Sequence, residues 1–220
     1  MNLLAIPNNF IELTAALDKE FAFKNILTVR STTTGHFLDT LFPKNTNVLR
    51  IIYKHRKDNS KIENTTTNKD VETILSSTKK KFDLICLDPF HEYYESSNDF
   101  ALLTSYLTDD GILISHDCYP QDKILTTKEF VKGVWCGVTY AAFIELAYKN
   151  PQWFYAVLNT DFGLGIVSKK KIQFVEQNLD RASQKTFIEM LQNDDENTYD
   201  YFAKHCKELI NMIDVPKQSP

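Results

Sequence analysis

Short apolar segments that alternate with helix-type segments constrain the fold of this chain more than any other feature. The segment "KFDLICLD" (81–88) is apolar at most positions, which is typical of a strand that is buried on both faces. Further strands are predicted at 25–31, 47–55, 111–117, 152–160 and 163–169. Helices are predicted at 9–22, 71–78, 95–107 and 130–149. Alternating strands and helices of this kind predict an α/β fold with a largely parallel sheet.

The end of the chain departs from this alternation. "DFG" (161–163) predicts a hairpin turn, whose returning strand would add an antiparallel strand at one edge of the sheet. Two amphipathic helices are predicted near 173–192 and 196–213. We therefore expect one domain over 1–170 and a C-terminal helical extension over 171–220 that packs on the same domain. The polar stretch 56–70 is predicted to hold one short edge strand at most.

Composition and charge narrow the classes of partner. A chain of 220 residues has room for one large domain or one domain with an appendage. Its 43% apolar and 25% charged residues are typical of a globular protein. The formal net charge of -4 offers no basic surface for phosphates, so a nucleic-acid partner is not expected.

The cysteines and the N-terminus bear on location. The four cysteines form no CxxC pair, so a disulfide framework is not expected and a reducing compartment is favoured. "MNLLAIPNNFIEL" lacks a basic start, and no stretch reaches the roughly eighteen apolar residues of a membrane span. We expect a cytoplasmic protein with no membrane partner.

Two strands end in an acid and an imidazole. Asp88 ends the strand 81–88 and is followed by His91, while the strand 111–117 ends in His116 and Asp117. Ligands of parallel sheets bind at the carboxyl ends of the strands. Either aspartate alone would be interpreted as a turn residue. The pair on consecutive strands instead predicts a shared divalent cation, because hard cations prefer oxygen ligands.

The same residues carry a family resemblance. "FDLICLDPFHEYYESSNDF" followed by "LTDDGILISHDCYP" resembles the fourth and fifth strands of class I S-adenosylmethionine-dependent methyltransferases. More narrowly, it is similar to metal-dependent small-molecule O-methyltransferases, the group of macrolide sugar methyltransferases and cephalosporin-hydroxylase-like proteins. The resemblance implies a Rossmann-like sheet. It also implies that Asp88, His116 and Asp117 bind Mg²⁺ or Mn²⁺, and that His91 is the catalytic general base.

The resemblance also places a cofactor loop after the first strand, in "LTVRSTTTGHF" (27–37). On this basis Thr32, Thr34, Gly35 and Asp88 are the candidate residues for binding S-adenosylmethionine. The stretch differs from the family pattern, because Arg30 stands where an acid is expected and Gly35 is its only glycine. The second strand, "IIYKHRKD", likewise ends in Lys54 and His55 where an acid usually holds the ribose.

Three hypotheses for the function follow. The first is a metal-assisted, S-adenosylmethionine-dependent O-methyltransferase whose substrate is a small hydroxylated molecule, a sugar or a secondary metabolite. The second is a methyltransferase fold with a decayed cofactor pocket that serves as a binding or scaffold protein. The third retains the metal for other chemistry, such as that of an iron-dependent oxygenase. The C-terminal helices are a candidate surface for homo-oligomer formation.

Three further residues are weaker candidates for a site. Trp135 and Tyr140 could line a pocket, although the composition of 130–149 favours a helix packed in the core. Cys118, next to Asp117, has no base beside it in the sequence and receives no role.

Overall fold

The computed structural model describes residues 7–42, 47–54, 68–172 and 176–215, and within them a single sheet of seven strands. The strands are β1 Asn25–Ser31, β2 Asn47–Tyr53, β3 Phe82–Asp88, β4 Leu107–Ser115, β5 Phe154–Leu158, β6 Leu164–Ser168 and β7 Met212–Ile213. The α-helices are α1 Phe10–Phe21, α2 Asn68–Thr78, α3 Tyr93–Ser105, α4 Thr139–Lys149, α5 Arg181–Gln192 and α6 Thr198–Ile210. Two short 3-10 helices are η1 His36–Thr40 and η2 Lys123–Thr126.

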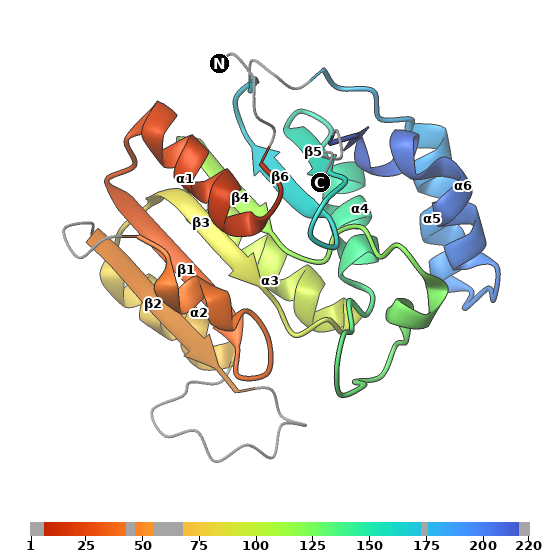
Figure 1. The fold of residues 1–220 in the computed structure, drawn as a ribbon, viewed down its shortest axis with the longest axis horizontal. Helices are drawn as coiled ribbons and strands as arrows, with labels where there is room; N and C mark the ends of the chain where they lie inside the picture. The colour runs from red at the N-terminus through yellow and green to blue at the C-terminus, as the bar shows by residue number, and fades with distance from the viewer. Residues whose placement is uncertain (1–6, 43–46, 55–67, 173–175, 216–220) are drawn as a thin grey trace, which may run out of the picture.

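The sheet has the order β2-β1-β3-β4-β6-β5-β7. Its first four strands are mutually parallel, as the sequence predicts. Every residue of β3 except Asp83 is buried, which explains the apolar run along that strand. The parallel arrangement brings the carboxyl ends of β1, β3 and β4 to one edge of the sheet (Figure 1).

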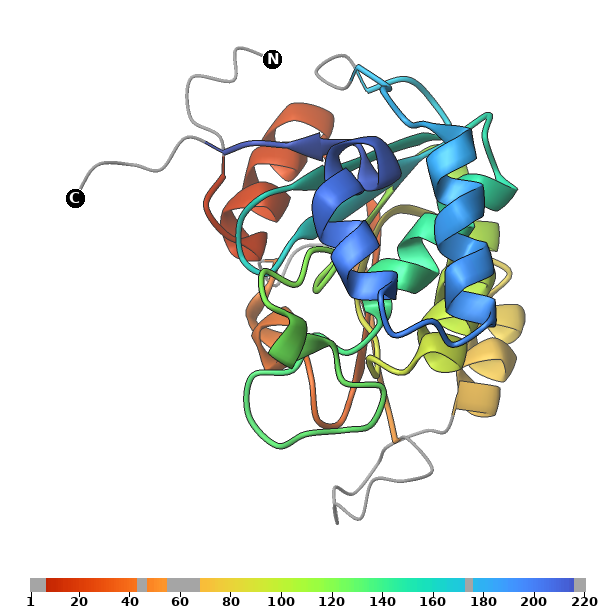
Figure 2. The ribbon, with the colours of Figure 1, turned by 90° about the vertical axis from the view of Figure 1, so that its right-hand side faces the viewer.

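Helices cover both faces of the sheet. One face packs against α1 and η1 through Phe10, Leu13, Leu17 and Leu38. The other face carries α2, α3 and α4, and its core extends to Phe187 of α5 and Phe202 of α6. Figure 1 shows α1 over one face, and Figure 2 shows α5 and α6 side by side. In the described part of the chain, no helix has both the length and the apolar character that crossing a bilayer requires.

The C-terminal hairpin is present, but its predicted position at the sheet edge is wrong. β6 runs antiparallel to both of its neighbours, β4 and β5, so it lies inside the sheet. Every residue of β6 is buried, as expected for a strand that is covered on both faces. β7 pairs in parallel with β5 and forms the edge, so the segment after residue 171 contributes a strand as well as helices.

The helix predicted over 130–149 begins only at Thr139, where α4 starts. Gly133 and Gly137 have φ angles of +119° and +54°, which do not fit a right-handed helix. Residues 130–138 therefore form a loop, and it is this loop that reaches the site described below.

Other element boundaries also differ from the sequence-based prediction. The segment Asp109-Asp110-Gly111, whose composition is typical of a turn, lies inside β4. A bulge there shifts the pairing with β3, and Gly111 approaches the Phe82 carbonyl closely. The C-terminal helices are shorter than predicted, because α5 begins after its cap residue Asp180 and α6 ends at Ile210, before Asn211 in the left-handed conformation. Most of the stretch 56–70 lies outside the described residues.

A buried polar link holds the loop that follows β3. The Tyr53 hydroxyl, at the end of β2, donates to Asp99 Oδ2 on α3 at 2.7 Å. The same hydroxyl accepts from the Phe90 backbone N–H at 2.8 Å. Burial raises the pKa of Asp99 to about 7, although the hydrogen bond from Tyr53 opposes this shift.

The raised pKa of Asp99 predicts a pH-dependent stability. The unfolded carboxyl loses its proton near pH 4 and the folded one near pH 7, so the stability due to this group is complete below pH 4 and is lost as the pH rises to 7. In Asp99→Asn this loss is absent. Between pH 4.5 and pH 7.5, urea unfolding should therefore show the free energy of unfolding of the wild type falling by roughly 3 kcal/mol relative to that of the variant. If the free energies of unfolding of the two proteins changed equally with pH, the raised pKa of Asp99 would be contradicted.

Candidate functional site

Two acids and two histidines converge at the carboxyl ends of β3 and β4. Leu87 pairs with Ser115 in the parallel ladder, and the His116 N–H donates to the Leu87 carbonyl at 3.1 Å. Asp88 and His116 therefore leave adjacent strands at the same level. Asp117 has a φ of +60°, a left-handed conformation that aspartate tolerates better than most residues.

Asp88, His116 and Asp117 form a candidate ligand set for a metal ion. One oxygen or nitrogen from each of them lies within 4.8 Å of the others. His116 Nδ1 is 2.9 Å from Asp117 Oδ2 and 3.7 Å from Asp88 Oδ2. Both aspartates are buried, and the His116 side chain is 12% exposed. Two carboxylates with one imidazole suit Mg²⁺ or Mn²⁺, and the nitrogen ligand favours Mn²⁺ of these two.

His91 lies between the same carboxylates. Its Nε2 is 2.8 Å from Asp88 Oδ1 and 3.0 Å from Asp117 Oδ2, and its Nδ1 is 2.6 Å from the Trp135 carbonyl. Burial by itself lowers the pKa of His91, but the negative charges of Asp117 and Asp88 outweigh it and raise the pKa to about 10. The protonated His91 ring therefore compensates part of the negative charge of the two carboxylates that it contacts.

The loop over 130–138 holds His91 in place. The Val138 N–H donates to the His91 carbonyl at 2.8 Å. A Cβ at Gly137 would lie 2.2 Å from that carbonyl oxygen, so only glycine permits this approach. The Trp135 ring also packs 5.2 Å from the His91 ring. Trp135, a candidate pocket residue from its sequence, contacts the site through its carbonyl, which bonds to His91 Nδ1.

His116 has a further charged neighbour that sequence analysis places only in a turn. Its Nε2 is 3.4 Å from Asp161 Oδ1. Burial works against both charges. The negative charge of Asp117, and after it the hydrogen bond to Asp161, raise the pKa of His116, and His116 in turn lowers the pKa of Asp161. The position of β6 beside β4 creates this contact, and nothing in the local sequence of residues 161–163 indicates it.

The candidate cofactor loop after β1 is closed on the end of β3. The Thr34 hydroxyl lies 3.0 Å from the Asp88 carbonyl and 3.2 Å from that of Pro89. A Cβ added to Gly35, which has a φ of +62°, would lie 2.7 Å from Asp88 Cβ. Thr32 is buried, and its N–H donates to the Tyr53 carbonyl of β2 at 2.9 Å. The loop thus leaves no space for a ligand between its backbone and Asp88.

Arg30 occupies the end of β1 in place of an acid. Its guanidinium is bidentate to Asp39, at 2.9 and 2.6 Å, and also donates to the Ser31 carbonyl. The side chain is 6% exposed. Between residues 32–35 and Asp88 there is no space for S-adenosylmethionine, so its binding at this point would require the loop to move.

The cysteines near the site are not reactive groups. Cys118 and Cys136 are both buried. Burial raises the pKa of each thiol well above its usual value, so neither is a thiolate at neutral pH.

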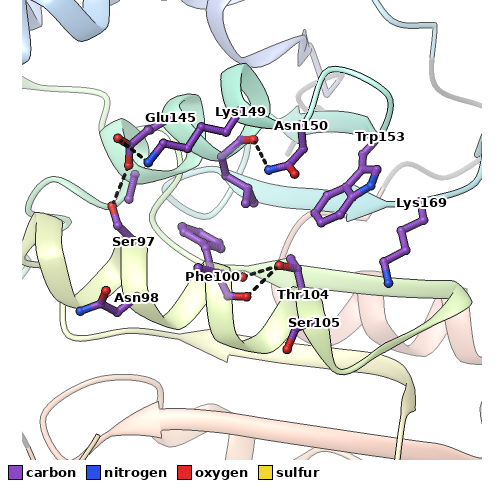
Figure 3. Close-up of a pocket in the computed structure, with 13 residues that line it drawn as sticks. Ser97, Asn98, Phe100, Thr104, Ser105, Glu145, Lys149, Asn150, Trp153 and Lys169 are labelled. Atoms are coloured by element: carbon purple, nitrogen blue, oxygen red, sulfur yellow. Dashed lines mark hydrogen bonds and ion pairs between the residues drawn. The ribbon is translucent and has the colours of Figure 1, made fainter. Parts of the chain in front are cut away.

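A cavity of about 440 Å³ lies between α3 and α4, where Trp153 and Lys169 also line it (Figure 3). Its charged side chains already have partners. Lys149 Nζ is 2.9 Å from Glu145 Oε1, and Lys169 Nζ lies over the Trp153 ring at 5.8 Å. None of the predicted site residues lines this cavity, so it is separate from the candidate metal centre.

Comparison with known proteins identifies structural but no sequence relatives. No family model and no curated protein matches the chain. A protein provisionally described as a caffeoyl-CoA O-methyltransferase, from Staphylococcus aureus, matches with a TM-score of 0.51 at 18% identity, over 77% of this chain and 87% of that one. A protein provisionally described as an O-methyltransferase, from Klebsiella pneumoniae, matches at 0.48 and 14% identity, over 76% and 83%. MycE from the mycinamycin biosynthetic pathway, in complex with Mg, SAH and mycinamycin VI, matches at 0.42 and 13%, over 78% and 51%.

The Staphylococcus aureus match bears on the fold alone, because its sequence identity is low. It supports an overall fold in common with that protein, and in this chain parallel strands on one side of the sheet join an antiparallel hairpin on the other. The expectation of a mostly parallel, Rossmann-like sheet with C-terminal helices is confirmed. The chain has the fold of the class I S-adenosylmethionine-dependent methyltransferases.

Proposed function

We propose that this chain is a divalent-metal-dependent O-methyltransferase that acts on a small hydroxylated molecule, such as a sugar or a secondary metabolite. The observation that carries the proposal is the ligand set of Asp88, His116 and Asp117 at the carboxyl ends of β3 and β4. That edge is where sheets of this type bind their ligands. The fold supports methyl transfer, and the buried acids support a metal.

The ligand set would hold the metal, and the metal would in turn bind a substrate hydroxyl and lower its pKa. His91 is the proposed general base: a divalent cation held by the carboxylates would offset the negative charges that keep the ring protonated, so that the neutral Nε2 could take the hydroxyl proton. The Trp135 carbonyl fixes the orientation of this ring through Nδ1. S-adenosylmethionine, when bound, supplies a methyl group on a sulfonium.

A cavity beside the His91 segment supports a small-molecule substrate. It measures about 480 Å³, within the usual range for small ligands. Tyr93 and Tyr94, which follow His91 closely, line it together with Val138 and Lys128. Glu92 and Asp194 also line it, and Lys128 is paired with Asp194. Aromatic faces with charged groups of both signs would suit an oxygen-rich or planar molecule.

A second candidate function is favoured by the closed loop after β1. Arg30 paired with Asp39, and Thr34 bonded to the Asp88 carbonyl, are the interactions expected of a fold that has lost its cofactor cradle. On this alternative the protein binds a metal but no S-adenosylmethionine, and serves as a binding or scaffold protein. Measurement of cofactor binding separates the two candidates.

The first prediction of the proposal is metal binding. Titration calorimetry with MnCl₂ should show one saturable site in the wild type, and Asp88→Asn and Asp117→Asn should each weaken it at least about tenfold, because each removes an anionic ligand. Mn²⁺ at a hundred times its Kd should also raise the free energy of unfolding by about 2.7 kcal/mol.

Asp122→Asn is the matched control for these variants. Asp122 is exposed and caps η2 through the Ile124 N–H at 3.0 Å, a role that asparagine retains. It makes the same change in net charge away from the site. A wild type without saturable binding, or an equal loss in Asp122→Asn, would refute the metal site.

Replacement of His91 should affect methyl transfer but not metal binding. In His91→Asn the three ligands remain and a competing positive charge is removed, so Mn²⁺ should bind at least as tightly as in the wild type. Methyl transfer to an acceptor found by screening hydroxylated compounds should fall by about 10²- to 10⁴-fold, as loss of a general base does. Loss of Mn²⁺ binding in this variant would show that His91 is a ligand and not the base.

Cofactor binding should depend on the opening of the loop. Calorimetry in excess Mn²⁺ should show S-adenosylmethionine binding to the wild type, and Thr34→Ala should strengthen it roughly two- to tenfold by removing a hydrogen bond that closes the loop. Thr33→Ala is the control, because the Thr33 hydroxyl contacts Ser31 and not β3. Weaker binding in Thr34→Ala would make Thr34 a direct cofactor contact. No binding by either protein would support the scaffold alternative.

A further inference from the structure

Asp161 contacts His116 of the candidate metal centre, although the sequence around it predicts only a turn. It lies between β5 and β6, and β6 pairs with β4 through Gly165 and Ser115. This pairing brings the turn to the same edge of the sheet as His116. Two backbone hydrogen bonds, from the N–H groups of Cys118 and Tyr119 to the carbonyls of Gly163 and Phe162, fasten the turn to the segment after Asp117.

The two oxygens of Asp161 have different partners. Oδ1 lies 3.4 Å from His116 Nε2, on the ring edge away from the other ligands. Oδ2 accepts from the Phe10 N–H at 2.9 Å, at the first turn of α1. The neighbouring Thr160 hydroxyl bonds to the Asn8 carbonyl. The turn therefore connects the start of α1 to His116.

The tautomer of His116 decides whether it can bind a metal. A neutral imidazole carries one N–H and one lone pair. If Nε2 carries the proton and donates it to Asp161, the lone pair of Nδ1 faces Asp88 and Asp117. If Nδ1 carried the proton, it could not coordinate the cation that the two carboxylates share.

Two carboxylates compete for the ring proton of His116, because Asp117 Oδ2 lies 2.9 Å from Nδ1 and Asp161 Oδ1 lies 3.4 Å from Nε2. A cation bound by Asp117 would leave Asp161 as the acceptor. The rings of Phe10, Phe37 and Phe162 lie 5.3 to 6.2 Å from the imidazole ring, centroid to centroid. These apolar neighbours offer the ring no hydrogen bond. The carboxylate of Asp161 is the group that the structure places at Nε2.

We propose that Asp161 is a positioning residue of the metal centre, which holds His116 in the Nε2–H tautomer so that Nδ1 can bind the metal. The inference rests on the proposed metal site and extends it to a residue outside the ligand set. Carboxylates that orient a ligating histidine in this way commonly contribute 10- to 100-fold to metal affinity. Asp161 would also link metal binding to the docking of α1, because both use the same carboxylate.

The test compares three variants of the full chain in calorimetric titrations with MnCl₂. Asp161→Ala removes the carboxylate. Asp161→Asn keeps an oxygen for the Phe10 N–H but can turn only its NH₂ group toward His116. Thr160→Val loosens the same end of α1 without touching His116. We expect a loss of about 10- to 100-fold in affinity for both Asp161 variants and less than about threefold for Thr160→Val.

A second measurement reports the tautomer directly. In two-bond ¹H–¹⁵N spectra of the Zn²⁺-loaded wild type, His116 should appear with a protonated Nε2, and this signature should weaken or shift in Asp161→Asn. Equal affinities for wild type and Asp161→Asn, or an unchanged His116 spectrum, would overturn the inference. Affinity lost equally in Thr160→Val would also overturn it, since α1 docking would then explain the effect. A wild type that binds no Mn²⁺ would instead overturn the proposed metal site itself.

Discussion

The parallel pairing of β3 with β4 is the constraint on which the site depends. The ladder continues through the hydrogen bond from the His116 N–H to the Leu87 carbonyl, so the chain leaves both strands at one level. Two buried carboxylates then face the same space, which is costly unless a positive charge compensates them. His91 provides that charge in the structure described here, and a divalent cation could take over the role.

Asp88 links the two halves of the proposed chemistry. Its carboxylate faces His91 and the other two members of the ligand set, while its carbonyl accepts a hydrogen bond from Thr34 of the loop after β1. Gly35 packs directly against its Cβ. A ligand that displaced this loop would therefore disturb the residue that also faces the metal. In the proposed methyltransferase, cofactor entry and metal binding would therefore be coupled through Asp88.

The sequence predicted the features that follow from local patterns, and missed those that depend on distant contacts. The apolar runs at 81–88 and 111–117 indicated buried parallel strands, and their terminal acids indicated a shared edge. The aromatic and small residues of 130–149 predict a helix throughout, but 130–138 form a loop, because Gly133 and Gly137 adopt positive φ angles that composition does not indicate. The contact of Asp161 with His116 needs β6 to insert beside β4, which no short segment encodes. The roles predicted for His91 and for the threonines after β1 remain predictions.

The most direct test of the metal centre is an anomalous difference map from crystals grown with Mn²⁺. The account predicts a single strong peak within about 2.5 Å of His116 Nδ1 and of one oxygen each from Asp88 and Asp117, with His91 moved out from between the two carboxylates. A map without a peak at these three residues, in which His91 still bridges the acids, would contradict it.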